Sequence, residues 1–334
     1  MERSPAKAVP YLDPCYDLPR LFGTEVRSDL DPAHGRGGGG RCMSMTLEGL
    51  AGSRPGPLFA IGGAEDKVKE RLILRAFVEA CGGADAHIVV LATASELPET
   101  GERYADLFYK LDADSVEVLR IVTREDAIDA GPEMLDLLEY STGLFMTGGN
   151  QLRITSALGG TAVAQAISQR HRAGMVVGGT SAGAAALSEY MISMGDSGGT
   201  PRRRLVQMAK GLGLAPHLVI DQHFRRRDRL GRLLTALSYN PAPLGVGIDE
   251  DTAAIIEGDT LRVLGSGAVT VIDASGMRFT DSHTAVRDQP LAMLGLKLDF
   301  LTTGCRYDLA RRAGIAPSRS EAGRESYEPV ESLS

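Results

Sequence analysis

The sequence of 334 residues contains no tryptophan, and aromatic residues make up only 5% of it. Proteins that bind single-stranded nucleic acid stack aromatic side chains on the bases, so this scarcity argues against such a platform. The formal net charge of −7 argues further against general binding to polyanions, although it is compatible with a cationic substrate. We therefore expect no nucleic-acid partner.

Cysteine is scarce as well, and the four residues lie far apart: Cys15, Cys42, Cys81 and Cys305. No two of them form a CxxC pair, and no histidine stands at the spacing of a metal ligand. We therefore expect no metal and no cofactor, and we interpret the thiols as bystanders in a reduced, cytoplasmic protein.

Long hydrophobic runs are also missing. No segment approaches the roughly 18–20 apolar residues of a membrane span, and the N-terminus lacks the apolar core of a secretory signal. We expect no membrane partner.

The remaining composition is that of a globular protein, with 43% hydrophobic and 24% charged residues. Residues 1–55 differ, because they hold six prolines and a run of four glycines without a sustained apolar period. Met43 or Met45 could be the biological start. We expect a disordered extension over 1–55, a single domain over 56–315 and a disordered tail over 316–334.

From Pro57 onward, apolar runs alternate with segments of helical periodicity. The expected strands are 58–61, 87–91, 116–122 and 144–146, and the expected helices are 65–81, 104–111, 132–140 and 154–172. This βαβ rhythm predicts an α/β fold with a mostly parallel central sheet and helices on both faces. Four later segments, joined in part by a Gly258-Asp259 turn, predict antiparallel strands that close the sheet toward the C-terminus: 246–248, 252–256, 261–264 and 269–272.

The segment Gly179-Thr-Ser-Ala-Gly183 carries the strongest chemical signal. It is a G-x-S-x-G motif that follows a short apolar run, 175–177, and precedes the helix formers 184–187. We expect Gly178 and Gly179 to break the strand there. A motif at such a strand-to-helix junction is typical of a nucleophile elbow, which exposes the serine hydroxyl, here that of Ser181. The alternative interpretation is an ordinary turn rich in small residues.

A serine nucleophile needs a base within hydrogen-bond reach and a third group that orients the base. Among six histidines, His223 follows a short strand and so lies at a strand end, where α/β folds place their sites; the alternative is a loop histidine. Asp249 and Glu250 follow another strand, and their side chains face opposite ways. Periodicity does not choose between them. The order Ser, His, acid matches neither the α/β-hydrolases nor chymotrypsin or subtilisin.

The oxyanion hole requires two donors near the serine. The N–H of Ala182 is the natural first candidate, since it follows the nucleophile. Gly148 or Gly149 is the second, because glycine lets the backbone approach a substrate closely. The alternative for this glycine pair is a plain strand-to-helix turn.

An arginine-rich run over 225–232 begins two residues after His223. Arg229 and Arg232 lie one helical turn apart, and a helix starting directly after His223 would aim at least one guanidinium into the mouth of the site. Because arginine grips carboxylates through paired hydrogen bonds, an acidic substrate feature is expected. We expect Arg225 and Arg226 to be solvated. The run is short and interrupted by an aspartate, which disfavours a nucleic-acid patch.

Taken in order, these motifs resemble the cyanophycinases, relatives of peptidase E. The matching segments cover about 60–280 and are FMTGGNQ (145–151), GGTSAGA (178–184), MISMG (191–195), GLGL (211–214), DQHF (221–224), RDRLGRL (227–233) and GIDEDT (247–252). The extension 1–55 has no counterpart in the family pattern, and neither do Arg225 and Arg226.

The resemblance implies that Ser181 is the nucleophile, His223 the base and Glu250, rather than Asp249, the acid. It also implies a set of residues that line the substrate pocket: Gln151, Asp221, Gln222, Arg227, Arg229 and Arg232. We add Thr180, the residue before the serine, to these substrate-binding candidates.

The family substrate is cyanophycin, a poly-aspartate chain with arginine joined to each β-carboxyl, and serine-type exopeptidase cleavage through an acyl-enzyme yields β-Asp-Arg dipeptides. A homodimer is implied as well. A peptidase E-like dipeptidase acting on Asp-X peptides is the nearest alternative. A catalytically silent protein that binds carboxylates is a further one. An amidotransferase-type site is disfavoured because it would have a cysteine at the elbow.

Overall fold

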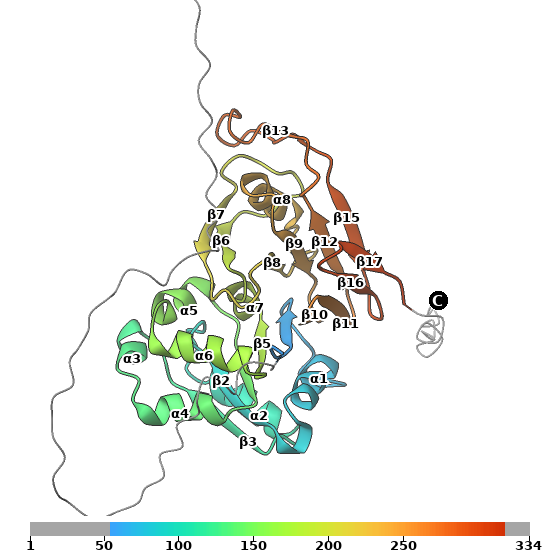
Figure 1. The fold of residues 1–334 in the computed structure, drawn as a ribbon. Coiled ribbons are helices and arrows are strands. Elements are labelled where there is room, and N and C mark those ends of the chain that lie inside the picture. The colour runs from blue at the N-terminus through green and yellow to red at the C-terminus, as the bar shows by residue number, and fades with distance from the viewer. Residues whose placement is uncertain (1–53, 318–334) are drawn as a thin grey trace, which may run out of the picture. The chain divides into compact units, whose positions relative to one another are not determined.

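The computed structural model describes residues 54–317 (Figure 1). The expected disordered extension and tail, with Met43 and Met45, therefore fall almost wholly outside the described residues. The described chain forms a nine-stranded sheet, a four-stranded sheet and two two-stranded ribbons.

The nine-stranded sheet has a parallel half and an antiparallel half that meet at β1. Its order is β17-β16-β11-β10-β1-β5-β4-β2-β3. The parallel strands are β1 (Leu58–Ile61), β5 (Val176–Thr180), β4 (Gly143–Met146), β2 (His87–Leu91) and β3 (Ser115–Leu119). The antiparallel strands are β10 (Thr252–Glu257), β11 (Thr260–Gly265), β16 (Arg306–Asp308) and β17 (Ala313–Ile315). The predicted mixed α/β architecture is confirmed.

Two of the strands expected to close this sheet belong instead to a second sheet. Its order is β15 (Lys297–Leu301), β12 (Val269–Asp273), β9 (Leu244–Ile248) and β8 (Leu218–Gln222). Strands β8, β9 and β12 are buried along their whole length, so their sequences show no alternation that could assign them to either sheet. The ribbons are β6 (Tyr190–Gly195) with β7 (Val206–Lys210) and β13 (Phe279–Thr280) with β14 (Met293–Leu294).

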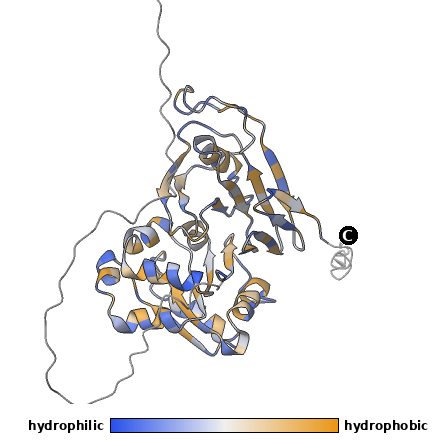
Figure 2. Cartoon of the chain, viewed as in Figure 1, coloured by the Kyte–Doolittle hydropathy of each residue, from blue (hydrophilic) through white to orange (hydrophobic). Residues whose placement is uncertain are grey.

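Helices cover both faces of the central sheet. Alternate residues of β1 show this, because Phe59 and Ile61 pack with α1 (Leu72–Ala80) and α2 (Thr100–Tyr109), whereas Leu58 and Ala60 face the other core. That second core includes α3 (Arg124–Ile128), α4 (Pro132–Tyr140), α5 (Gln151–Leu158), α6 (Ala162–Arg172) and α7 (Ala182–Ala186). The helices alternate apolar and polar stripes (Figure 2), as amphipathic helices on a sheet do. Helix α8 (Leu230–Tyr239) packs on the second sheet.

Three local expectations were wrong. The helix expected from residue 65 begins at Leu72, because the Asp66 carboxylate accepts backbone N–H groups of residues 68, 69 and 71 and holds them in a loop. The helix expected over 154–172 is two helices, separated by a turn with Gly160 at φ +77°. Strand β5 continues through Gly178, where a side chain would collide with Phe77, instead of ending there.

Candidate active site

Ser181 stands between β5 and α7 with a strained backbone, φ 51° and ψ −107°. Such angles are costly for a residue with a side chain and persist only where the surroundings impose them. The flanking glycines explain why the turn is feasible. A Cβ on Gly179 would lie 2.4 Å from the carbonyl carbon of Gly183, and one on Gly183 would lie 2.3 Å from the Met146 oxygen. The local geometry is that of a nucleophile elbow.

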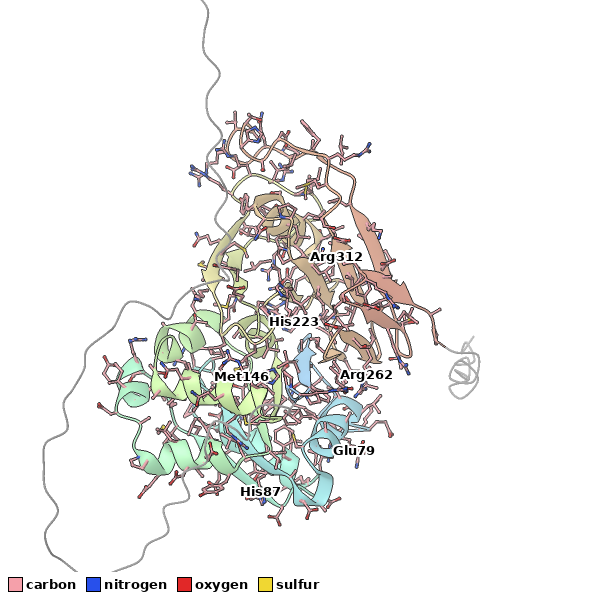
Figure 3. The ribbon with its side chains drawn as sticks, viewed as in Figure 1. Glu79, His87, Met146, His223, Arg262 and Arg312 are labelled. Carbon is pink, nitrogen blue, oxygen red and sulfur yellow. The ribbon has the colours of Figure 1, made fainter. Side chains whose placement is uncertain are left out.

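His223 and Glu250 reach this serine from the second sheet. His223 follows β8, Glu250 follows β9, and Figure 3 places His223 between the two sheets. The Nε2 atom of His223 lies 2.9 Å from Ser181 Oγ, and its Nδ1 lies 2.7 Å from Glu250 Oε1. Because a carboxylate only accepts hydrogen bonds, Nδ1–H donates to Glu250 and Nε2 is left to accept from the serine hydroxyl.

The two neighbouring acids are occupied elsewhere. Asp249 accepts the backbone N–H groups of Arg225 and Ala268, at 3.1 and 3.2 Å. Asp251 accepts the N–H of Asp66 at 2.9 Å. The geometry therefore brings Glu250 to the imidazole and turns Asp249 away from it.

The pKa of His223 is lowered from its ordinary value, first because the ring is buried. The hydrogen bond to Glu250 opposes this shift, while the positive charges of Arg227 and Arg229 add to it. The imidazole is consequently neutral near pH 7 and able to accept a proton, as a general base must be.

A short segment, Ile61–Gly63, anchors all three parts of this arrangement, and sequence reasoning missed that role. The carbonyl of Ile61 accepts the N–H of Ser181 at 2.9 Å, and that of Gly62 accepts the N–H of His223 at 2.8 Å. The Gly63 carbonyl accepts the N–H of Asp251, next to Glu250, at 2.9 Å. The only signal in the sequence is a glycine pair at the end of a strand.

The oxyanion candidates lie against the nucleophile. A Cβ on Gly148 would come within 3.4 Å of Ser181 Cβ, so that the backbone there passes directly beside the serine. Gly149 has φ +141°, and a Cβ would lie 2.0 Å from the Ala94 oxygen, which makes glycine obligatory. Ala182 is fully buried at the first turn of α7.

The arginines of the run do not behave alike. The helix expected directly after His223 begins only at Leu230. Arg232 is 5% exposed and its Nε donates to Asp221 Oδ2 at 2.6 Å, with Nη2 on the other oxygen. Arg229 donates Nη1 to the backbone oxygen of Gln222 at 2.6 Å and also to its side chain. These two guanidinium groups compensate a buried carboxylate, so they are not simply free in the site mouth.

Arg229 nevertheless has one N–H donor that these hydrogen bonds do not use. Its Nε atom is buried and has no hydrogen-bond partner among the described residues. Burial and the neighbouring charge of Arg232 lower the pKa of Arg229 to about 10, which leaves it charged at neutral pH. Arg227 is exposed beside His223.

Two other candidates are also engaged within the protein. Gln151 donates its Nε2 to the backbone oxygens of Ile192 and Ser193, at 2.9 and 3.0 Å. Thr180 is 3% exposed, and its hydroxyl donates to Glu65 at 2.6 Å. Their side chains are thus fixed by neighbours before any substrate arrives.

Arg225 and Arg226 are exposed, as expected, but each lies near an acid. Arg225 Nη1 is 3.9 Å from Asp249, and Arg226 Nε is 3.4 Å from Glu250 Oε2. Both are weak pairs because water screens them.

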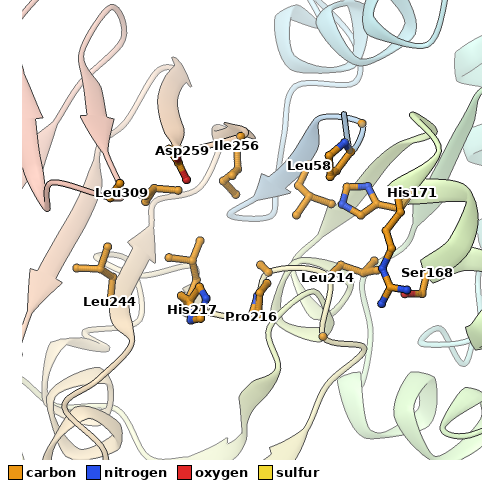
Figure 4. Close-up of a pocket in the computed structure, with 18 of the residues that line it drawn as sticks. Leu58, Ser168, His171, Leu214, Pro216, His217, Leu244, Ile256, Asp259 and Leu309 are labelled. Carbon is orange, nitrogen blue, oxygen red and sulfur yellow. The ribbon is translucent and has the colours of Figure 1, made fainter. Parts of the chain in front are cut away.

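A cavity of about 770 Å³ lies away from the relay (Figure 4). Leu58, Leu218 and Leu244 line it, and each is the first residue of its strand, whereas Ser181, His223 and Glu250 follow strand ends. The cavity therefore belongs to the opposite edge. Among residues 54–317, no cluster of three or more His, Cys, Asp or Glu side chains could hold a metal ion. In the same range, every helix is too short or too polar to span a bilayer.

Comparison with known proteins agrees with this geometry. The sequence model of peptidase family S51 matches residues 58–264, and the chain therefore belongs to that family, as a serine-type peptidase. A solved structure, a peptidase from an acI-B1 Actinobacterium, shares the fold with a TM-score of 0.57 and 21% identity, covering 79% of this chain and 98% of that one.

Within the family, the chain is similar to proteins named cyanophycinase. The one from Trichormus variabilis is 43% identical over 258 residues, which cover 76% of this chain and 86% of the relative. The one from Synechococcus elongatus is 44% identical over 270 residues, covering 80% and 83%. That from Geminocystis herdmanii is 42% identical over 254 residues, covering 75% and 93%.

Proposed function

We propose that this chain is a cyanophycinase, a serine-type exopeptidase that hydrolyses cyanophycin to β-Asp-Arg dipeptides through an acyl-enzyme. The observation that carries the proposal is the hydrogen-bonded series Ser181–His223–Glu250, at 2.9 and 2.7 Å. Beside it lies an arginine cluster, which consists of Arg227, Arg229 and Arg232. The similarity to relatives named cyanophycinase supports the choice of substrate.

In the acylation step, Ser181 Oγ attacks an aspartyl backbone carbonyl carbon while His223 Nε2 takes the hydroxyl proton. Glu250 holds the Nδ1–H and stabilises the imidazolium that forms. The backbone N–H of Ala182 and one from Gly148 or Gly149 hold the oxyanion; a single such donor is typically worth about 10²–10³ in kcat. The C–N bond then breaks as His223 returns the proton to the leaving amine.

Deacylation repeats these roles with water as the nucleophile. His223 removes a proton from the water, whose oxygen attacks the acyl carbon, and then returns that proton to Ser181 Oγ. The neutral state of His223, favoured by its burial, is required at the start of both steps.

Recognition of the polymer falls to the arginine cluster. Each cyanophycin side chain ends in a free α-carboxylate, which suits the guanidinium of the exposed Arg227. Asp221 and Gln222 fix Arg229 and Arg232. Gln151 is bound to the backbone of β6, and Thr180 is bound to Glu65. These residues form the substrate pocket in this proposal.

The decisive assay adds purified protein to insoluble cyanophycin granules and identifies soluble products by mass spectrometry. Release of β-Asp-Arg is expected from the wild type and from Ser156→Ala, a matched change on an exposed helical serine. Ser181→Ala should reduce the rate at least 10³-fold. Hydrolysis of Asp-X dipeptides without attack on granules would identify the peptidase E-like alternative, and binding without turnover the silent one.

We also propose that the enzyme acts in the cytoplasm as a homodimer without a nucleic-acid partner. The net charge of −7 and the scarcity of aromatic residues support the last point. Sedimentation equilibrium of the full chain, with and without single-stranded DNA, measures the assembly. A monomer at micromolar concentration, or co-sedimentation with the DNA, would contradict it.

A further inference from the structure

Glu65 is a buried carboxylate that the mechanism above does not use. It lies four residues beyond the end of β1, and its side chain is 1% exposed. A buried charge without partners would destabilise the folded state. The hydrogen-bond and ion-pair partners of Glu65 therefore indicate its role.

Its two oxygens have different partners. Oε1 accepts the hydroxyl of Tyr104 and lies 2.8 Å from Lys67 Nζ. Oε2 accepts the hydroxyl of Thr180 at 2.6 Å. One oxygen is therefore tied to α2 and to a compensating charge, and the other to the last residue of β5.

Thr180 directly precedes Ser181, so its hydrogen bond to Glu65 lies one peptide bond from the nucleophile. Ser181 holds φ +51°, a strained angle that the protein must impose. Its N–H is bound to Ile61, in the same strand-end segment that precedes Glu65. The Thr180 hydroxyl and the Ser181 N–H together hold the strand side of the turn against residues 61–65.

We propose that Glu65 is a positioning residue, which orients Ser181 by holding the Thr180 hydroxyl. This inference rests on the proposed peptidase function and adds to it. Glu65 does not itself touch substrate, because its carboxylate is enclosed by its partners. Tyr104 keeps its proton to donate, since burial and then the charge of Glu65 raise its pKa well above the ordinary value.

The test distinguishes the hydrogen bond to Oε2 of Glu65 from the contacts to its Oε1. Thr180→Val keeps the shape of the side chain but removes the hydroxyl that meets Oε2, whereas Thr180→Ser keeps the hydroxyl and removes a methyl group. Lys67→Met is the matched control, because it removes the charge that meets Oε1. For each variant, kcat and KM are measured on cyanophycin oligomers of defined length, together with thermal stability.

We expect kcat to fall in Thr180→Val by on the order of 10-fold to 10²-fold, because a displacement of about 1 Å has that effect. KM should stay within about twofold, since a transition-state contact is lost and not uniform binding. Thr180→Ser should retain most of kcat. Lys67→Met should keep kcat.

A double-mutant cycle tests whether the Thr180 hydroxyl affects kcat through its hydrogen bond to Glu65. Glu65→Leu should lower kcat in the wild-type background and have almost no further effect in Thr180→Val. Equal effects in both backgrounds, or Thr180→Val with unchanged kcat, would overturn the inference. If Glu65→Leu does not fold, the comparison of Thr180→Val with Thr180→Ser still shows whether the Thr180 hydroxyl is needed for full kcat. An inactive wild type would instead refute the proposed function.

Discussion

Replacing Gly63 by alanine should disable the site with little change elsewhere. The residue has φ +94°, and a Cβ there would lie 2.4 Å from His223 Cε1 and 2.5 Å from Nε2. Ordinary contacts begin at 3.4 Å, so the ring must retreat by about 1 Å. His223 is 8% exposed and is hydrogen-bonded at both nitrogens, so this retreat breaks the relay.

The expected loss can be estimated from that displacement. A misplacement of about 1 Å costs on the order of 10² in rate, because the reacting groups no longer start from near-attack geometry. The left-handed backbone conformation adds a stability cost of about 1–2 kcal/mol for any residue with a Cβ. Gly63→Ala should therefore show both effects.

Gly160→Ala separates the two effects. Gly160 has φ +77°, and no atom of residues 54–317 outside its own chain neighbours lies within 4 Å of its Cβ position, so alanine there brings the strain without the collision. Both variants should lose similar stability in urea unfolding, but only Gly63→Ala should lose turnover of cyanophycin oligomers. Full activity of Gly63→Ala, or an equal loss of activity in the two, would refute the reasoning.

Other predictions concern charge and burial. Arg227→Gln removes a charge that lowers the pKa of His223, so the acid limb of the kcat/KM profile should move to higher pH; a shift to lower pH would contradict the assignment. Asp221→Asn leaves the buried Arg232 uncompensated and should cost about 3–5 kcal/mol in urea unfolding, and a loss below about 1 would mean that the pair is solvated. Burial raises the pKa of Cys81, so its thiol should resist alkylation at pH 8 until the protein unfolds; peptide mapping that finds it labelled in the folded protein would exclude the buried placement.

The elbow could be predicted from sequence because its demands are local. A strand, a strained serine and a short helix need small residues at the adjacent positions, and Gly179 and Gly183 provide them. The alternating strands and helices were readable for a similar reason, since each depends on periodicity within its own segment. The place of His223 at a strand end made it a candidate base, whereas the choice of Glu250 over Asp249 had no local signal and came from the resemblance to a family.

The second sheet could not be predicted in the same way. Strands such as β8 and β9 are buried on both faces, so they read as uniform apolar runs, and the partner of a strand is a non-local property. The sequence predicted that a guanidinium of this run points inward, but not that Arg232 pairs with Asp221, because that carboxylate belongs to a different element, the strand β8. Glu65 likewise stood only as the first residue of an expected helix.

The three successive carbonyls of residues 61–63 bear on when this protein becomes competent during its own synthesis. Residues 61–63 are synthesised early. Asp251, whose N–H the Gly63 carbonyl accepts, is synthesised about 190 residues later. A nascent chain that has built the parallel half of the sheet still lacks its acid. The relay is thus incomplete until β10 aligns with β1, so that the parallel half of the sheet alone does not support peptide-bond hydrolysis.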